Sequence, residues 1–453
     1  MEQLLALKNR MGFVLHALVL LVVGSAVGYA SIFFAGASAG EVDASAISSG
    51  DTAWMLVAAA LVMLMTPAVG FFYGGMVSAK NVVSVIKQSL VILALVSLQW
   101  VVLGYTLAFG PDVMGVIGNL DYFGLRGVGF APNADYAATI PHLVFMIFQA
   151  MFAIITPALI IGAFVGRIRF ITLVIFTLLW TTLVYDPIAH SVWAVGGWIR
   201  DLGALDFAGG TVVHMAAGFS ALAAAIVVGR RIDPLGPSVS ANNVPFVILG
   251  AALLWFGWFG FNAGSALAAG ALAASAFVVT NTAAAAAALT WVALSWAESR
   301  KPSALAAAIG AVCGLVAITP ASGYVGPVAA IAIGIIAGVV TYAAVWIRLR
   351  KINVDDTLDV WAAHGVGGLA GALLTGIFAE KAINAAGNNG LLFGNPDQLW
   401  TQLIAVAATA TYAFVATYIL LKILSWFSPI RVTSAEESEG LDTAAHGETA
   451  YRL

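Results

Sequence analysis

Residues 207–229 read FAGGTVVHMAAGFSALAAAIVVG, which is 23 residues with no Asp, Glu, Lys or Arg and a single histidine, His214. About 20 consecutive apolar residues form a helix long enough to cross roughly 30 Å of hydrocarbon. An ionisable side chain at membrane depth is costly, so it is interpreted first as functional. The stretch therefore predicts a membrane-spanning helix with a functional histidine near its middle.

The whole chain has a similar composition. Its 453 residues are 61% hydrophobic and 9% charged, whereas ordinary soluble domains have about 45–50% and about 25%. So few charges cannot cover a water-soluble surface. The net charge of −3 and the single Cys313 add no sign of nucleic-acid binding or of a disulfide scaffold. Apolar runs of about 20 residues favour helices over a transmembrane barrel.

The predicted fold class is all-α, a polytopic membrane protein with eleven transmembrane helices separated by turn residues and charges. Residues 110–139 carry several charges and are predicted to form an extramembrane loop. The predicted spans cover residues 53–78, 82–109, 140–166, 169–195, 207–229, 244–268, 273–297, 303–319, 324–347, 358–379 and 398–427.

A twelfth apolar run, about 11–36, precedes these spans. Basic residues flank its start, and Ala37-Ser38-Ala39 follows it, a pattern suited to signal peptidase. The run is long for a signal peptide, so residues 1–40 are interpreted as either a cleaved signal or an N-terminal anchor. Residues 51–428 are then the transmembrane domain, and residues 429–453 are a C-terminal tail.

The Lys and Arg residues predict the orientation in the membrane. Fourteen of the nineteen lie in the turns of one side or at the C-terminal end, and the opposite side holds Arg126, Arg200 and Lys381. Loops rich in Lys and Arg stay in the cytoplasm. The first of the eleven spans should therefore enter from outside, and the tail should be cytoplasmic.

The two halves of the chain carry matching features. The fifth span holds His214 and the tenth holds His364, while Gly70–Gly75 in the first span and Gly257–Gly264 in the sixth both combine glycines with aromatics. Five spans in each half would make the second half an inverted repeat, with a site near the midplane at the interface. The other interpretation is that both histidines only join helices through hydrogen bonds.

Two carboxylates accompany the histidines. Asp206 is expected about 12 Å from His214 along a helix, near the outer end of its span. Asp359 is expected near the inner end, about two turns before His364. Both are interpreted as helix caps or structural anchors.

Aromatic residues form two stripes at helical spacing. Phe148 and Phe152 share one face, and Trp258, Phe261 and Ser265 share another. Such stripes indicate packing, or a pore wall whose aromatic faces hold a small cation. An aromatic at the outer membrane end, such as Trp193, is also typical of the interfacial belt.

The sequence contains no phosphate loop, metal-ligand cluster or nucleophile elbow. An enzyme is therefore not expected, and neither is a cofactor or a metal. His446 in the polar tail is expected to be solvated.

At these residues the chain resembles the Amt branch of the Amt/Rh ammonium transporters, over nearly its whole length from residue 51. The matching stretches are Phe72-Tyr73-Gly74-Gly75-Met76-Val77, Arg167-Ile168-Arg169-Phe170, Asp186 to Trp193, Asp206 to His214, Gly257 to Ser265, Asp359 to Gly368, and Glu439 to Glu448.

The resemblance implies a homotrimer with a pore through each subunit. It implies an outer ammonium recruitment site of Trp193, Phe152 and Ser265, and a gate of stacked Phe152 and Phe261. The twin histidines, His214 and His364, would line an apolar conduit. Asp206 and Asp359 would have supporting roles, and Asp206 would not hold the ion directly.

The resemblance also implies a bacterial inner-membrane location, a role in nitrogen assimilation and a PII-type partner at the cytoplasmic face. The predicted function is recruitment of NH₄⁺, deprotonation, and conduction of NH₃. Two alternatives remain: an ammonium sensor with little flux, although no fused output domain is present, and a channel for another small neutral molecule such as CO₂ or methylamine.

Overall fold

The computed structural model describes residues 44–232 and 241–451 and places a helix at each of the eleven predicted spans. The predicted N-terminal signal or anchor, residues 1–40, lies outside the described residues. Within the described part, ten helices are long and apolar enough to cross a membrane. The eleventh, α12, is 15 residues long, or about 22 Å at the usual rise. The all-α membrane fold is confirmed.

Several spans are built from consecutive helical segments. The segments are α2 (Ser49–Met76), α3 (Val82–Gln99) with η3 (Trp100–Gly104) and α4 (Tyr105–Phe109), α5 (His142–Ile160), α6 (Phe170–Trp180) with η6 (Thr181–Tyr185), α7 (Asp186–Trp193) and α8 (Trp198–Asp201), η7 (Gly210–Met215) with α9 (Ala216–Val228), α10 (Val244–Gly264), α11 (Ala271–Ser299), α12 (Ala304–Ile318), α13 (Pro327–Lys351), η8 (Trp361–Val366) with α14 (Gly367–Phe378), and α15 (Asp397–Phe427).

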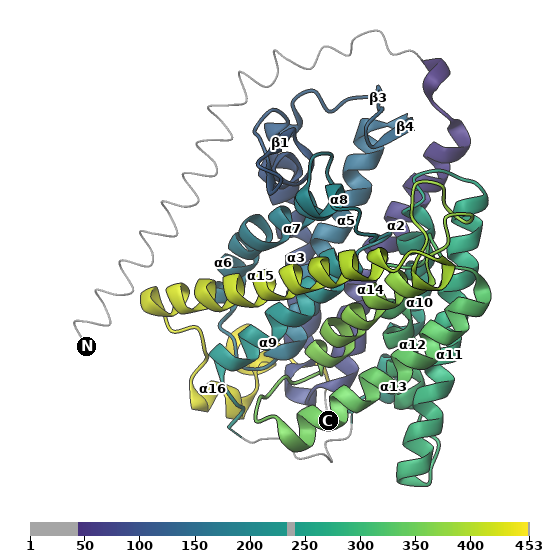
Figure 1. Cartoon of the computed structure of the whole chain (residues 1–453). Helices are drawn as coiled ribbons and strands as arrows, with labels where there is room; N and C mark the ends of the chain where they lie inside the picture. Colours follow the sequence, from purple (N-terminus) through teal and green to yellow (C-terminus); the bar gives the residue numbers. More distant parts are fainter. Residues whose placement is uncertain (1–43, 233–240, 452–453) are drawn as a thin grey trace.

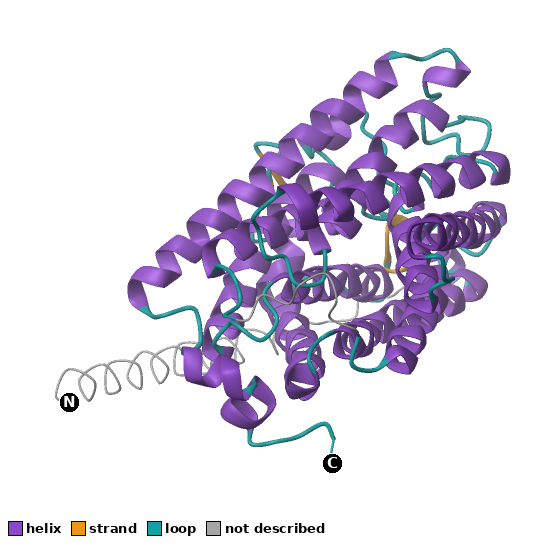
Figure 2. Ribbon diagram, turned by 90° about the horizontal axis from the view of Figure 1, so that it is seen from below, coloured by secondary structure: helices purple, strands orange, loops and turns teal. Residues whose placement is uncertain are grey.

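The predicted extramembrane loop contains the only strands among the described residues. They form two antiparallel pairs, and the loop lies with α8 at one end of the bundle, which we call the strand end (Figure 1). Figure 2 shows how small a part of the body they are. The pairs are β1 (Asp112–Val113) with β2 (Ile117–Gly118), and β3 (Pro132–Asn133) with β4 (Ala137–Pro141).

The opposite end of the bundle, which we call the tail end, carries α16 (Ser434–Glu439) and α17 (Leu441–His446) (Figure 1). The carboxylate of Asp442 accepts hydrogen bonds from the backbone N–H groups of Val83 and Ser84, at 3.0 and 2.7 Å, and so caps the start of α3. Short 3₁₀ turns complete the chain: η1 (Ala44–Ala46), η2 (Ala79–Asn81), η4 (Phe123–Leu125), η5 (Ile161–Ala163) and η9 (Leu391–Phe393).

The prediction that His446 is solvated is wrong. Its ring is half-buried against Phe170, with Nε2 3.2 Å from Ser84 Oγ and Nδ1 3.1 Å from Lys87 Nζ. The polar composition of the tail gave no indication that α17 packs on α3. Its docking depends on contacts between residues about 360 positions apart.

Glycines let the spans approach closely. A Cβ atom at Gly257 would lie 2.7 Å from Leu61 O, so α10 packs directly on α2. A Cβ atom at Gly218 would lie 2.0 Å from the backbone nitrogen of Gly365, so the backbones of α9 and η8 touch. Small residues are what membrane helices use for such contacts. The second contact lies one turn beyond His214 and beside His364.

Candidate functional site

Both predicted histidines lie in π-helical turns, His214 in η7 and His364 in η8. Wide turns of this kind are rare and often occur at functional sites. The turn η7 starts after Gly209, whose φ of +109° favours glycine. Span boundaries read from hydropathy alone did not predict these turns.

The two histidine rings lie side by side. The Nδ1 atoms of His214 and His364 are 3.3 Å apart, and the rings are stacked at 5.4 Å between centroids. Both side chains are buried. When both rings are neutral, this contact requires one Nδ1 to donate and the other to accept. The Nε2 atom of His214 is buried without a partner among the described residues.

Apolar side chains surround the pair. The rings of Trp258 and Phe261 stack on His214 at 5.2 and 5.8 Å. Beside the histidines is a cavity of about 10 Å³, which matches the space of about 10–15 Å³ that one water-sized molecule needs. Its lining is apolar apart from the histidines, Tyr73 and Trp258: Val69, Phe72, Tyr73, Ile155, Leu159, His214, Leu254, Trp258, Val312 and His364.

A series of ring contacts connects the strand end to the histidines. Trp193, the last residue of α7, meets Phe152 edge-on at 5.7 Å. Phe152 then contacts Phe261 at 4.3 Å, and Phe261 stacks on His214. Phe152 and Phe261 are almost fully buried, whereas Trp193 is half-buried.

Ser265 follows the end of α10, one turn beyond Phe261. Its hydroxyl donates to Phe261 O at 2.9 Å and is half-buried. A hydroxyl that donates its hydrogen keeps its oxygen lone pairs as acceptors. Ser265 can therefore accept a hydrogen bond from a donor at the strand end.

The Asp206 carboxylate is fully engaged by its own chain. It accepts from the backbone N–H groups of Gly209, Gly210 and Thr211 at 2.7–2.8 Å, and from the Thr211 hydroxyl. Its backbone oxygen accepts from Trp193 Nε1 at 2.9 Å. Asp206 thus caps η7 and orients Trp193. It does so from the loop before the helix, since η7 begins only at Gly210.

The counterpart of Asp206 in the second half is Asp356 rather than Asp359. Asp356 Oδ2 accepts from the backbone N–H of Trp361, five residues on, just as Asp206 accepts from Thr211. Each carboxylate also precedes its histidine by eight residues. Burial raises the pKa of Asp356, and its Oδ1 has no partner among the described residues. The eight-residue spacing was a sequence signal for this match.

Asp359 is an anchor and not a cap. It has a positive φ of +56° and pairs with Arg348 at the end of α13. Burial raises its pKa to about 6, although Arg348 opposes the shift. Its carboxylate thus ties the loop before η8 to α13.

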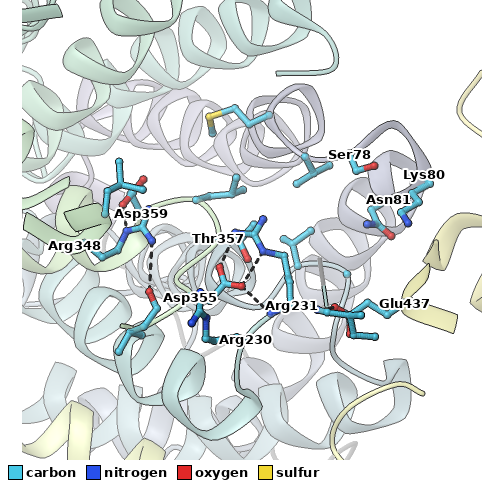
Figure 3. Close-up of a pocket in the computed structure, with 18 of the residues that line it drawn as sticks. Ser78, Lys80, Asn81, Arg230, Arg231, Arg348, Asp355, Thr357, Asp359 and Glu437 are labelled. Atoms are coloured by element: carbon cyan, nitrogen blue, oxygen red, sulfur yellow. Dashed lines mark hydrogen bonds and ion pairs between the residues drawn. The ribbon is translucent and has the colours of Figure 1, made fainter. Parts of the chain in front are cut away.

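A cavity of about 870 Å³ opens at the tail end, beyond the histidines (Figure 3). Arg231 and Asp355 form its central ion pair, with Nη2 and Oδ1 2.6 Å apart. Burial alone would raise the pKa of Asp355, but the hydrogen bonds from Arg231 and the charge of Arg167 hold it below its ordinary value. Arg230, Arg348, Asp359 and Glu437 also line this cavity.

The structure therefore brings most of the predicted site residues together. The ring contacts join Trp193, Phe152, Phe261, His214 and His364, Ser265 is bonded to the backbone of Phe261, and Asp206 is bonded to Trp193. Asp359 lies apart, at the tail-end cavity. The contact of Trp258 with His214 was not predictable from the sequence, because the two residues lie on separate spans that only the fold brings together.

Comparison with known proteins identifies the family. A profile of the Ammonium Transporter Family matches residues 53–451. The chain is 50% identical over 403 residues to an ammonium transporter of Bacillus subtilis, covering 89% of this chain and 98% of that protein. The crystal structure of Candida albicans Mep2 is similar at a TM-score of 0.82 and 35% identity, covering 86% of this chain and 88% of that one.

A structure described as a sensor Amt protein is also similar, with a TM-score of 0.80 and 34% identity over 88% of this chain and 98% of that one. The profile covers nearly the whole described chain, and the relative from Bacillus subtilis is covered almost end to end. This chain belongs to the Ammonium Transporter Family.

Proposed function

We propose that this ammonium transporter recruits NH₄⁺ at Trp193, Phe152 and Ser265, removes a proton, and conducts NH₃ past His214 and His364. The observation that carries the proposal is the unbroken series of ring contacts from Trp193 to the twin histidines. Phe152 and Phe261 act in it as a gate, because their contact at 4.3 Å closes the path.

The recruitment site selects by chemistry rather than by size. NH₄⁺ is close to K⁺ in size, but it donates hydrogen bonds and can lose a proton. Aromatic faces stabilise a desolvated cation by about 2 kcal/mol or more, and Ser265 Oγ adds an acceptor. Asp206 has its oxygens engaged by N–H and O–H groups, so it supports the site without binding the ion.

The conduit then rejects intact ions. An ion in an apolar cavity costs several kcal/mol, whereas NH₃ avoids that cost and K⁺ has no neutral form. Two buried imidazoles in contact hold at most one extra proton between them cheaply, so they offer a temporary proton acceptor. The cavity of about 10 Å³ beside them fits one molecule of this size.

We further propose that the strand end is extracellular, that the tail end is cytoplasmic in a bacterial inner membrane, and that three subunits assemble. Residues 51–428 form the transporter domain and residues 429–453 the tail. A PII-type protein would dock at the tail-end cavity. The family relationship supports this assembly, and the basic residues lining the cavity support a docking surface there. Native mass spectrometry of the purified protein with a PII protein tests the trimer and the PII complex.

The transport proposal is tested with purified protein in liposomes, by solid-supported-membrane current and by an interior pH indicator. Ammonium and methylammonium should give a saturable interior pH change, with a current as well if the released proton also crosses the membrane, and K⁺ should give neither. Trp193→Leu should raise the KM for ammonium. Trp400→Leu, a change at an exposed tryptophan, is the matched control and should leave the KM unchanged. Equal signals for K⁺ and ammonium would refute the proposal.

The likeness to a sensor Amt protein gives a second candidate function, an ammonium sensor with little flux. The same liposomes separate the two. A sensor would show saturable ammonium binding by calorimetry but neither current nor interior pH change above empty liposomes.

A further inference from the structure

His190 is a buried histidine that the proposed pathway does not use. It lies in α7, three residues before Trp193, and its side chain has no exposed surface. An ionisable group buried at the strand end of a membrane span requires a reason. The partners of its two ring nitrogens supply one.

Both ring nitrogens of His190 face acceptors. Nδ1 is 3.1 Å from Ala108 O, and Nε2 is 2.9 Å from Asp112 Oδ1. A backbone carbonyl has no hydrogen to donate. The same Asp112 oxygen, Oδ1, accepts a second hydrogen bond from the backbone N–H of Gly115 at 2.8 Å, so it acts as an acceptor. A neutral imidazole has one N–H and could satisfy only one of its two partners, so both nitrogens must carry hydrogen.

The pair also controls the chain segment that carries Trp193. The backbone oxygen of His190 accepts from Ala194 N at 3.0 Å, which closes the helical turn containing Trp193. Beyond it, Gly196 passes so close to Asp112 that a Cβ atom there would lie 2.7 Å from that of Asp112. The loop that holds Asp112 thus packs against the residues on both sides of Trp193.

Other polar groups at this turn contact the backbone and leave the ring of His190 to its two partners. Arg200 donates to Trp193 O at 2.8 Å, and the Tyr136 hydroxyl accepts from Val195 N at 3.4 Å. Asp112 is therefore the carboxylate that balances a charge on His190.

We propose that His190 is an imidazolium that pairs with Asp112 and acts as a positioning residue, fixing Trp193 at the recruitment site. The functional half of this statement rests on the proposed role of Trp193. The charge of His190 and the fixing of the turn do not rest on it. A rigidly held aromatic loses less entropy when it binds a cation, so the pair should lower the KM for ammonium more than it changes the maximum rate.

The charge is tested on the full-length protein labelled with ¹⁵N-histidine, by solid-state NMR in lipid. The chain has six histidines, and His190→Gln assigns the signal of interest. Both nitrogens of His190 should have imidazolium shifts at neutral pH. Asp112→Asn should convert the signal to that of a neutral ring, and Asp112→Glu should retain the imidazolium. A neutral ring in the wild-type protein would overturn the proposal.

The positioning role is tested by hydrogen exchange of the Ala194 amide and by transport. Asp112→Asn should speed this exchange and raise the KM about five-fold, the factor for an ion pair worth about 1 kcal/mol, with little change in maximum rate. Asp112→Glu should restore both. Asp135→Asn is the control, because it removes one charge from the same loop at an exposed position without a side-chain contact to His190.

The positioning role is overturned if Asp112→Asn and His190→Gln both keep the wild-type hydrogen-exchange rate at the Ala194 amide and the wild-type KM for ammonium. Faster exchange in those variants together with a wild-type KM in Trp193→Leu would give a different result. It would refute the recruitment role of Trp193 and leave the imidazolium and its hold on the turn standing.

Discussion

At the scale of single residues, Phe261 lies between the proposed recruitment site and the histidines. Its ring contacts both Phe152 and His214 and is fully buried. Truncation to Ala would open the proposed gate and would also remove core contacts, at a cost of about 3–5 kcal/mol in the free energy of unfolding. We expect Phe261→Ala to fold but to change the ammonium flux measured in liposomes.

Phe259→Ala is the matched control for that change. Phe259 lies in the same helix but stacks on Phe277 at 3.9 Å, away from the histidines. It should lower thermal stability without altering flux. If both variants are less stable but still transport ammonium at wild-type rates, Phe261 only packs the core.

The sequence predicted the key residues where their chemistry was unusual for their surroundings. His214 and His364 were readable because an ionisable group in an apolar run is costly. Asp356 could have been found from its eight-residue spacing to His364, which matches that of Asp206 to His214. His190 and His446 could not, because each acts through partners that only the fold brings near. The placement of Asp206 in a loop before η7 likewise depends on the left-handed Gly209, which hydropathy does not reveal.

At the scale of helices, the crossing of α9 and η8 sets the distance between the histidines. A Cβ atom at Gly218 would lie 2.0 Å from Gly365 N, so Gly218→Ala must push the two backbones apart. We expect this substitution to lower the free energy of unfolding by about 1–3 kcal/mol and to abolish transport. Gly129→Ala, where a Cβ atom would have no neighbour within 4 Å, should change neither thermal unfolding nor flux.

Docking of the tail helix α17 should depend on pH through His446. Burial and the charge of Lys87 lower its pKa in the docked state, whereas a free histidine titrates near about 6.5. The docked tail therefore binds fewer protons than the free tail. The contribution of His446 to the free energy of docking is complete above about pH 6.5 and is lost as the pH falls below that value. Limited proteolysis of the tail should be faster at about pH 5.5 than at about pH 7.5.

His446→Gln removes the titrating group and controls for the protease's own pH dependence. In this variant, the ratio of tail cleavage rates at the two pH values should equal the ratio of the protease's own activities at those values. An equal pH response in the wild-type protein and in this variant would show that His446 does not control docking.

The spans themselves were predictable because length and hydropathy decide them. Their subdivision was not, since the π-helical turns η7 and η8 lie where the carboxylates of Asp206 and Asp356 bind backbone N–H groups and where Gly218 touches Gly365, contacts that hydropathy does not show. The tail shows the same limit. Its own sequence is polar, and its helices are held by hydrogen bonds with distant segments, from Val83 N–H to Asp442 and from Ile232 N–H to Glu437.

At the scale of the whole molecule, the distribution of Lys and Arg predicts the orientation. Fourteen of nineteen lie on the side of the C-terminal tail. A reporter that is active only outside the cytoplasm should be inactive when fused after Leu453 and active when fused after Asp135 in the strand-end loop. The reverse pattern would contradict the proposed orientation and the outer position of Trp193.

In the proposed mechanism, the contact of His214 with His364 provides the proton acceptor in an apolar path. The most direct measurement is flux through the folded, assembled His214→Ala/His364→Ala variant in liposomes, with ammonium and K⁺ compared by current and by interior pH. His142→Ala controls for losing a buried histidine, since that ring bonds Tyr105 away from the twin pair. We expect the double variant to lose ammonium-dependent current or to begin to admit K⁺. A folded double variant that carries ammonium at the wild-type rate and still excludes K⁺ would contradict it.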